Sequence, residues 1–186
     1  EATAAGASLG VRVIGGCEFS VAAAWGEMHL LGYFLQPGDA DIEHFLVSAR
    51  TDRSRRAREM VTRLVGLGVR IGYDDVEREA DGGAVGRPHV ARALLRLGLV
   101  TTEQQAFDKY LGRGRPCFVD KALPTLREVA DLVHARGGIV SAAHLKWHGA
   151  KVTLAALQLD VLDAVETRHP SHDGETRATS TEAAAA

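Results

Sequence analysis

The sequence has few cysteines, no long apolar run and little net charge. Cys17 and Cys117 lie outside any Cys-x-x-Cys spacing, which argues against a zinc knuckle or a disulfide framework and favours a reducing, cytoplasmic compartment. No stretch approaches the roughly 20 apolar residues of a membrane span. The net charge of -2 argues against binding of duplex DNA through bulk electrostatics. We therefore expect a cytoplasmic protein that binds neither membranes nor duplex DNA.

The composition is that of a globular protein. The 186 residues are 46% hydrophobic and 25% charged, which is enough to bury one core without disulfides. The first residues carry no basic segment followed by an apolar one, so no secretory leader is expected. The chain opens on Glu1 and ends in a run of alanines, so both ends are expected to be cut or atypical.

The hydrophobic pattern alternates between strands and helices. Apolar runs predict strands, at residues 11–19, 28–35, 139–143 and 164–167. Periodic segments predict helices, at about 41–67, 74–80, 88–97, 101–111, 126–135 and 152–159. Strands followed by helices, with polar residues at the strand ends, are typical of a βα barrel. The fold class is therefore predicted to be α/β, with a mostly helical block over residues 41–120.

Polar residues recur in or at the end of the predicted strands. They are Glu18, His29, His144, His169 and His172. Carboxylate and imidazole groups bind divalent cations, and two or three adjacent ions can bind a phosphate and generate hydroxide near neutral pH. A single histidine in a strand is more often a hydrogen-bonded core residue than a ligand. Spacing alone does not decide between the two interpretations, because no His-x-His or His-Glu-x-x-His motif is present.

A second candidate site lies at the start of the helix predicted near residue 88. Gly86 allows close approach to the backbone, Pro88 suits the first helical position, and Arg87 and His89 can bind an anion. The alternative is a simple helix cap with two exposed polar side chains. Local sequence favours the two interpretations equally.

Several segments resemble, in order, the motifs of one protein family. They are residues 10–20 (GVRVIGGCEFS), 29–34 (HLLGYF), 86–91 (GRPHVA), 110–112 (YLG), 143–144 (AH) and 169–172 (HPSH). Together they resemble the polymerase and histidinol phosphatase (PHP) family of metal-dependent phosphoesterases. Within it they are similar to a subgroup that hydrolyses nucleoside 3',5'-bisphosphates and includes 5'-3' exoribonucleases. The similarity covers roughly residues 9–175.

The resemblance implies a fold, a cofactor and a set of site residues. The fold would be a partial, distorted (β/α)7 barrel formed by residues 1–40 and 121–175, with a helical insertion at 41–120 and a low-complexity tail at 176–186. Glu18, His29 and His144 would be metal ligands, with manganese the expected ion and zinc, iron or magnesium as alternatives. Nucleotides or short oligonucleotides would be the substrates. Their phosphates would face the remaining predicted site residues, Arg87, His89, His169 and His172.

Part of the family pattern is absent from this sequence. The family opens with a His-x-His strand and an Asp-His-Asp segment and closes with a Gly-Ser-Asp-x-His strand, and none of these is present. Leu145 follows His144 where the family usually has proline, and Arg168 precedes His169 where an aromatic residue is common. We therefore expect a fragment with an impaired metal site. Alternatives are a non-catalytic nucleotide-binding module, or an inactive piece that self-associates through open barrel edges.

Overall fold

The computed structural model describes residues 1–145 and 160–185. The helix predicted at 152–159 and His148 lie outside the described residues. The chain divides into two compact units, one formed by Glu1–Ile42 together with Leu123–Ala186 and the other by Glu43–Ala122. The first unit contains the sheet, and the second is helical.

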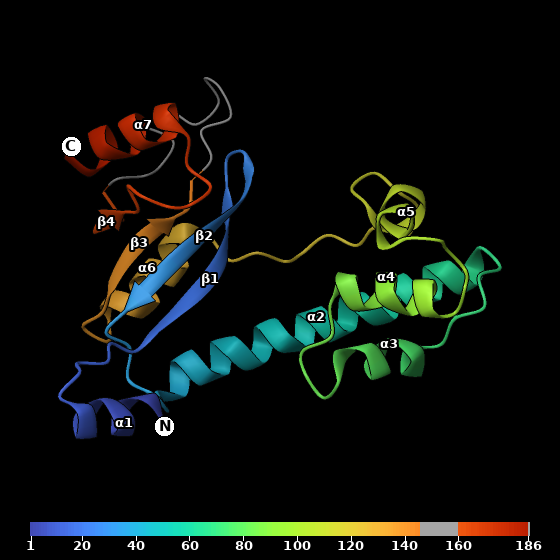
Figure 1. Ribbon diagram of the computed structural model, residues 1–186, viewed down its shortest axis with the longest axis horizontal. Coiled ribbons are helices and arrows are strands. Elements are labelled where there is room, and N and C mark those ends of the chain that lie inside the picture. The colour runs from blue at the N-terminus through green and yellow to red at the C-terminus, as the bar shows by residue number, and fades with distance from the viewer. Residues whose placement is uncertain (146–159, 186) are drawn as a thin grey trace. The chain divides into compact units, whose positions relative to one another are not determined.

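A four-stranded sheet forms the centre of the first unit, in the order β1-β2-β3-β4 (Figure 1). The strands are β1 (Gly16–Ala23), β2 (Gly26–Tyr33), β3 (Ile139–Ala143) and β4 (Ala164–Val165). The first three pair antiparallel, whereas β3 and β4 run parallel. The predicted α/β class is confirmed, and over the described ranges the sheet is open and not closed into a barrel.

Strand β1 begins later in the sequence than predicted. The prediction placed it at residues 11–19, but Gly16 pairs with Tyr33 at one end of the ladder and Ala23 with Gly26 at the other. The two-residue turn at 24–25 fixes this register, because a short hairpin pairs its strands directly from the turn outward. The apolar residues before Gly16 instead follow the helix α1 (Ala2–Leu9), which was not predicted from the sequence.

The two faces of the β1–β2 hairpin differ in polarity. Phe19 and Val21 on β1 and Met28 and Leu30 on β2 are buried, and they pair directly across the two strands. Because successive side chains of a strand point to opposite faces, Glu18 and His29 lie on the other face. The helix α6 (Leu126–His134) packs against β1, β2 and β3 (Figure 1). The buried face is therefore the core, and the opposite face carries polar groups.

Asp163 joins α6, β3 and the segment before β4. Its carboxylate accepts a hydrogen bond from the backbone N–H of Val140 at 2.7 Å and lies 2.7 Å from Nε2 of His134. Burial acts to raise the pKa of Asp163, but the Val140 and His134 contacts outweigh it, so the pKa lies below its ordinary value. Asp163 therefore contributes most to folding as a carboxylate.

We expect the substitution Asp163→Ala to destabilise the protein by about 1–3 kcal/mol near neutral pH, because the Val140 N–H loses its acceptor. The carboxyl has a lower pKa folded than unfolded. Its contribution is therefore present above the unfolded pKa and is lost as the pH falls through the folded pKa. Urea unfolding at several pH values measures this. The control Asp160→Ala removes only an exposed pair with Arg127 and should change stability by less than about 1 kcal/mol at every pH.

Four helical segments and a π-helical turn make up the second unit. They are α2 (Ala40–Gly66, which begins in the first unit), α3 (Tyr73–Ala80), α4 (Arg87–Arg96), α5 (Glu103–Ala106) and the π-helical turn Phe107–Leu111. The helices predicted at 41–67, 74–80 and 88–97 are confirmed within one or two residues. The single helix predicted at 101–111 is instead divided into α5 and the π-helical turn. Buried Met60, Leu64, Val90 and Leu94 belong to the core of this unit.

The last described element is the helix α7 (Gly174–Ala185), which packs against β4 (Figure 1). Thr176, Ser180 and Ala183 are buried on one side of it. This helix occupies the segment for which the sequence indicated a low-complexity tail. None of the described helices is long and apolar enough to span a bilayer.

Candidate functional site

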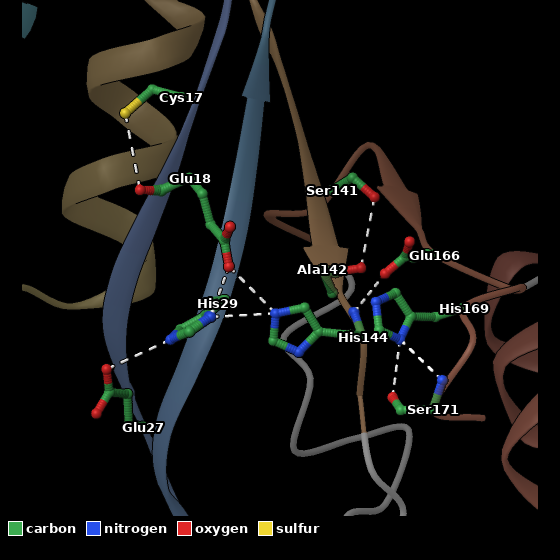
Figure 2. Close-up of polar contacts among 10 residues, drawn as sticks. All are labelled: Cys17, Glu18, Glu27, His29, Ser141, Ala142, His144, Glu166, His169 and Ser171. Atoms are coloured by element: carbon green, nitrogen blue, oxygen red, sulfur yellow. Dashed lines mark hydrogen bonds and ion pairs between the residues drawn. The ribbon is translucent and has the colours of Figure 1, made fainter. Parts of the chain in front are cut away.

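Three of the predicted site residues lie together on the polar face of the sheet. Nδ1 of His29 is 2.6 Å from Oε1 of Glu18, and Nε2 of His144 is 3.1 Å from the same oxygen. The two imidazole nitrogens are 3.1 Å apart. Figure 2 shows the three side chains pointing toward one another from β1, β2 and the end of β3. One ligand atom from each lies within 4.8 Å of the others, so a single cation could contact all three.

The strand register brings these residues together. His29 pairs with Ser20 on one side and with Ala143 on the other, so Glu18 is diagonal to His29 on the same face and His144 follows directly. Diagonal positions on neighbouring strands are within reach of long side chains. His144 has a φ of 31°, in the left-handed region of backbone conformation, which residues other than glycine rarely occupy. The chain therefore leaves the strand at His144 with an unusual backbone conformation.

The donor atoms suit a borderline divalent cation. Two imidazole nitrogens and one carboxylate oxygen are ligands that zinc, manganese and iron accept. The hydrogen bond with His144, followed by the influence of His29, lowers the pKa of Glu18 although partial burial acts to raise it. Glu18 is therefore a carboxylate at neutral pH. The side chains of the cluster are 36% to 48% exposed, so an ion can reach them from solvent.

Two carboxylates support the histidines of this cluster, and the sequence analysis did not identify either. Glu166, just after β4, accepts a hydrogen bond from the backbone N–H of His144 at 2.6 Å (Figure 2). Glu27 lies 3.4 Å from Nε2 of His29, the ring nitrogen that does not face Glu18. A contact to the second ring nitrogen, like that of Glu27, fixes the ring orientation of a metal-binding histidine, whereas Glu166 holds the backbone of His144. Glu166 could have been identified from the sequence as a carboxylate at the end of a predicted strand. No comparable sequence pattern marks Glu27.

His169 and His172 continue from the cluster as a row of imidazoles. The ring centroids of His144 and His169 are 5.4 Å apart, and those of His169 and His172 are 5.6 Å apart. Nδ1 of His169 accepts a hydrogen bond from the backbone N–H of Ser171 at 3.2 Å. The His172 side chain is buried, and neither of its ring nitrogens has a hydrogen-bond partner in the described part of the chain. His169 is therefore beside the cluster, and His172 lies beyond it.

Arg87 and His89 lie in the helical unit, at the start of α4. Nδ1 of His89 accepts a hydrogen bond from the backbone N–H of Gly86 at 2.9 Å, so His89 caps the helix. Because that nitrogen is an acceptor, the proton of the neutral ring is on Nε2. The Arg87 guanidinium lies over the rings of Phe107 and Phe118, at 5.6 and 5.4 Å. Nδ1 of His89 therefore serves as the helix cap, and Nε2 remains able to donate a hydrogen bond.

The chain is similar to several known proteins. It is 33% identical over 144 residues to a 5'-3' exoribonuclease of Haemophilus influenzae, covering 77% of this chain and 52% of that protein. It is 32% identical over 147 residues to a 3',5'-nucleoside bisphosphate phosphatase of Chromobacterium violaceum, covering 77% and 51%. A crystal structure from Bifidobacterium adolescentis, assigned to the metal-dependent phosphoesterases, superposes with a TM-score of 0.78 at 29% identity, covering 99% of this chain and 67% of that one. No protein-family model matches.

The sequence motifs predicted a relationship to metal-dependent phosphoesterases and to hydrolases in general. These similarities confirm that relationship. The chain spans about half the length of the curated relatives it matches.

Proposed function

Since the chain is related to the metal-dependent phosphoesterases, we propose that it hydrolyses phosphate esters of nucleotides or short oligonucleotides, with a divalent cation held by Glu18, His29 and His144. The observation that carries this proposal is the approach of one ligand atom from each residue to within 4.8 Å of the others. These three donors come from β1, from β2 and from the residue that directly follows β3. A structural histidine needs one partner, as His134 has in Asp163, whereas His29 and His144 each face both Glu18 and the other imidazole.

The residues of the chain have separate roles in this proposal. Glu18 supplies negative charge that offsets the cation, and Glu27 and Glu166 hold the two ligand histidines in orientation. When bound, the cation supplies Lewis-acid chemistry that stabilises charge on phosphate oxygens and acidifies water. Arg87, His89, His169 and His172 are proposed to bind the substrate phosphates, since guanidinium and imidazole N–H groups donate to phosphate oxygens.

Incubation of the chain with Mn²⁺ and either a nucleoside 3',5'-bisphosphate or a 5'-phosphorylated trinucleotide tests the proposal. We expect Mn²⁺ to bind and phosphate or nucleotide to be released slowly. Turnover should be low because three donors suit one ion, whereas two-ion phosphoesterases use further carboxylates and imidazoles. Nucleotide binding without any metal-dependent release would favour the non-catalytic binding module. Failure to bind both Mn²⁺ and nucleotide would refute the proposal.

Three finer expectations belong to the same proposal. Manganese is expected to support activity better than zinc, iron or magnesium. A reducing, cytoplasmic location fits Cys17 and Cys117, which are free thiols whose pKa values are raised, chiefly by burial. Self-association through the open edges of the sheet is expected to appear in sedimentation velocity experiments.

We expect the substitution Glu166→Gln to weaken metal binding without unfolding the protein. The carboxylate accepts the backbone N–H of His144, and the weaker amide acceptor would hold that strand end less firmly. Changes in residues that orient metal ligands cost roughly 10–100-fold in affinity, and the lower end applies here because the contact is to the backbone. Titration with Mn²⁺ monitored by electron paramagnetic resonance measures the change. Glu175→Gln, an exposed residue of α7, is the matched control and should bind Mn²⁺ like the unmodified chain.

A further inference from the structure

The described sheet has two edge strands, β1 and β4 (Figure 1). They differ in length, because β4 has two residues and β1 has eight. The helix α7 also packs against β4. A long edge strand presents a row of backbone groups with which another strand can pair. Of the two edges, β1 is therefore the one that can accept a further strand.

The backbone of Ala22 shows which residues of β1 face outward. Its N–H donates to the backbone oxygen of Pro124 at 2.8 Å and therefore points away from β2. Residues along an antiparallel strand direct their backbone groups alternately to one side and to the other, so Gly16, Glu18 and Ser20 face outward as well. In the described part of the chain, β1 pairs with β2 and otherwise makes only the bridge at Ala22. We call Gly16, Glu18 and Ser20 the free edge.

The free edge is complementary to itself. A second copy of the chain that runs antiparallel can place Glu18 opposite Glu18 and Gly16 opposite Ser20. Directly opposed residues of this kind exchange both of their N–H···O bonds, so this register gives a partner to every backbone group of the free edge. A shift by two residues would instead oppose Gly16 to Ala22, whose N–H already has an acceptor. One register is therefore favoured.

Apolar side chains beside the free edge also favour a protein partner. Val13 and Ile14, directly before β1, are 39% and 48% exposed, and Tyr33, which pairs with Gly16, is 37% exposed. Exposed apolar side chains that lie together mark interaction surfaces on soluble proteins. Edge strands are commonly blocked by lysine, proline or other charged residues, and β1 has a single charged residue, Glu18.

We propose that β1 pairs with β1 of a second copy of the chain, in antiparallel orientation and with the two-fold axis at Glu18. The expected self-association is thereby assigned to one strand and one register. Opposed side chains of an antiparallel pair lie on the same face, so the two Glu18 carboxylates face each other and weaken the dimer. Pairing needs neither a bound cation nor hydrolysis, so it can fail while the proposed function stands, and the reverse also holds.

Fluorescence-detected sedimentation in EDTA tests the pairing without any metal. A trace of labelled unmodified chain is sedimented with increasing concentrations of an unlabelled partner chain. With the unmodified chain as partner, we expect a weak dimer. With Glu18→Lys as partner, association should be roughly tenfold tighter, because opposite charges then face each other across the axis. Labelled Glu18→Lys with unlabelled Glu18→Lys should again associate weakly, since like charges are restored.

Two controls separate this register from other modes of association. Glu175→Lys makes the same change of charge at an exposed position of α7 and should associate with the labelled chain no more tightly than the unmodified chain does. Ser20→Pro removes an outward N–H, which an edge strand tolerates, and should abolish the dimer, whereas Ser20→Thr keeps the N–H and should retain it. Circular dichroism shows whether Ser20→Pro is folded, and the charge exchange at Glu18 decides the question without it.

Two results would overturn the proposal. One is an unmodified chain that stays monomeric at every concentration, also with Glu18→Lys as the partner. The other is association that Glu18→Lys strengthens no more than Glu175→Lys does, because the copies would then meet through a different surface. Metal binding and hydrolysis are measured separately, so their failure is distinguishable from failure of the pairing.

Discussion

Replacing Glu18 with glutamine should remove most of the divalent-metal affinity of the chain while leaving it folded. Glu18 is the one carboxylate of the cluster, and its oxygen contacts both His29 and His144. An amide of the same shape loses the negative charge that a dication requires. The loss should exceed the roughly 10–100-fold that changes in supporting residues cause. Co²⁺ absorption and isothermal titration with Mn²⁺ are suitable measurements.

Any effect of Glu18→Gln on folding stability can be measured separately from the loss of metal affinity. The Glu18 contacts are partly exposed to solvent, and exposed ion pairs contribute no more than about 1 kcal/mol. Urea unfolding in EDTA should therefore differ little between Glu18→Gln and the unmodified chain. The matched control Glu59→Gln changes an exposed glutamate of α2 and should leave metal binding intact. Unchanged Mn²⁺ affinity in Glu18→Gln would show that the cluster is not a metal site.

Truncation of Phe19 should produce the largest loss of stability among single substitutions in the sheet. Its side chain is 2% exposed, and its ring lies so close to Gly32 that a Cβ added there would be 3.0 Å from Cε2 of Phe19. Phe19→Ala removes the ring and leaves a cavity between the sheet and α6, at a cost of about 3–5 kcal/mol. Total stabilities of domains are about 5–15 kcal/mol, so much of the folded population could be lost at moderate urea concentration.

Urea unfolding followed by circular dichroism measures this effect. Leu9→Ala is the control, because Leu9 is 75% exposed and a surface substitution usually changes stability by no more than about 0.5 kcal/mol. Phe19 neighbours Glu18, so loss of metal affinity should accompany unfolding in this variant. A stability change of less than about 1 kcal/mol for Phe19→Ala would mean that this face of the sheet is not the core.

The elements that the sequence predicted well have strong local signals. The apolar positions of α2, the proline near the start of α4 and the two glycines after α6 mark helices whose ends depend on nearby residues. The strand predicted at 139–143 has the same bounds as β3, whereas the boundaries of β1 were predicted less well, because β1 depends on the partner β2 and on the turn between them. The π-helical turn at Phe107–Leu111 was not predictable, since its residues have the same periodicity as an ordinary helix.

Candidate ligands could be named from the sequence, but their supporting residues could not. Glu18, His29 and His144 were identified because polar groups interrupt or end apolar strands. Glu166 acts through the backbone of His144, 22 residues away, and that contact exists only where β3 and β4 run side by side.

The sequence by itself determined the α/β class, the long helices, the relationship to metal-dependent phosphoesterases and the residue types available for a metal site. These follow from periodicity and from ordered local motifs, which neighbouring residues encode. Only the tertiary structure decided that Glu18, His29 and His144 meet and that Glu166 holds His144. Those contacts join residues up to 126 positions apart, and strand register and helix packing fix them.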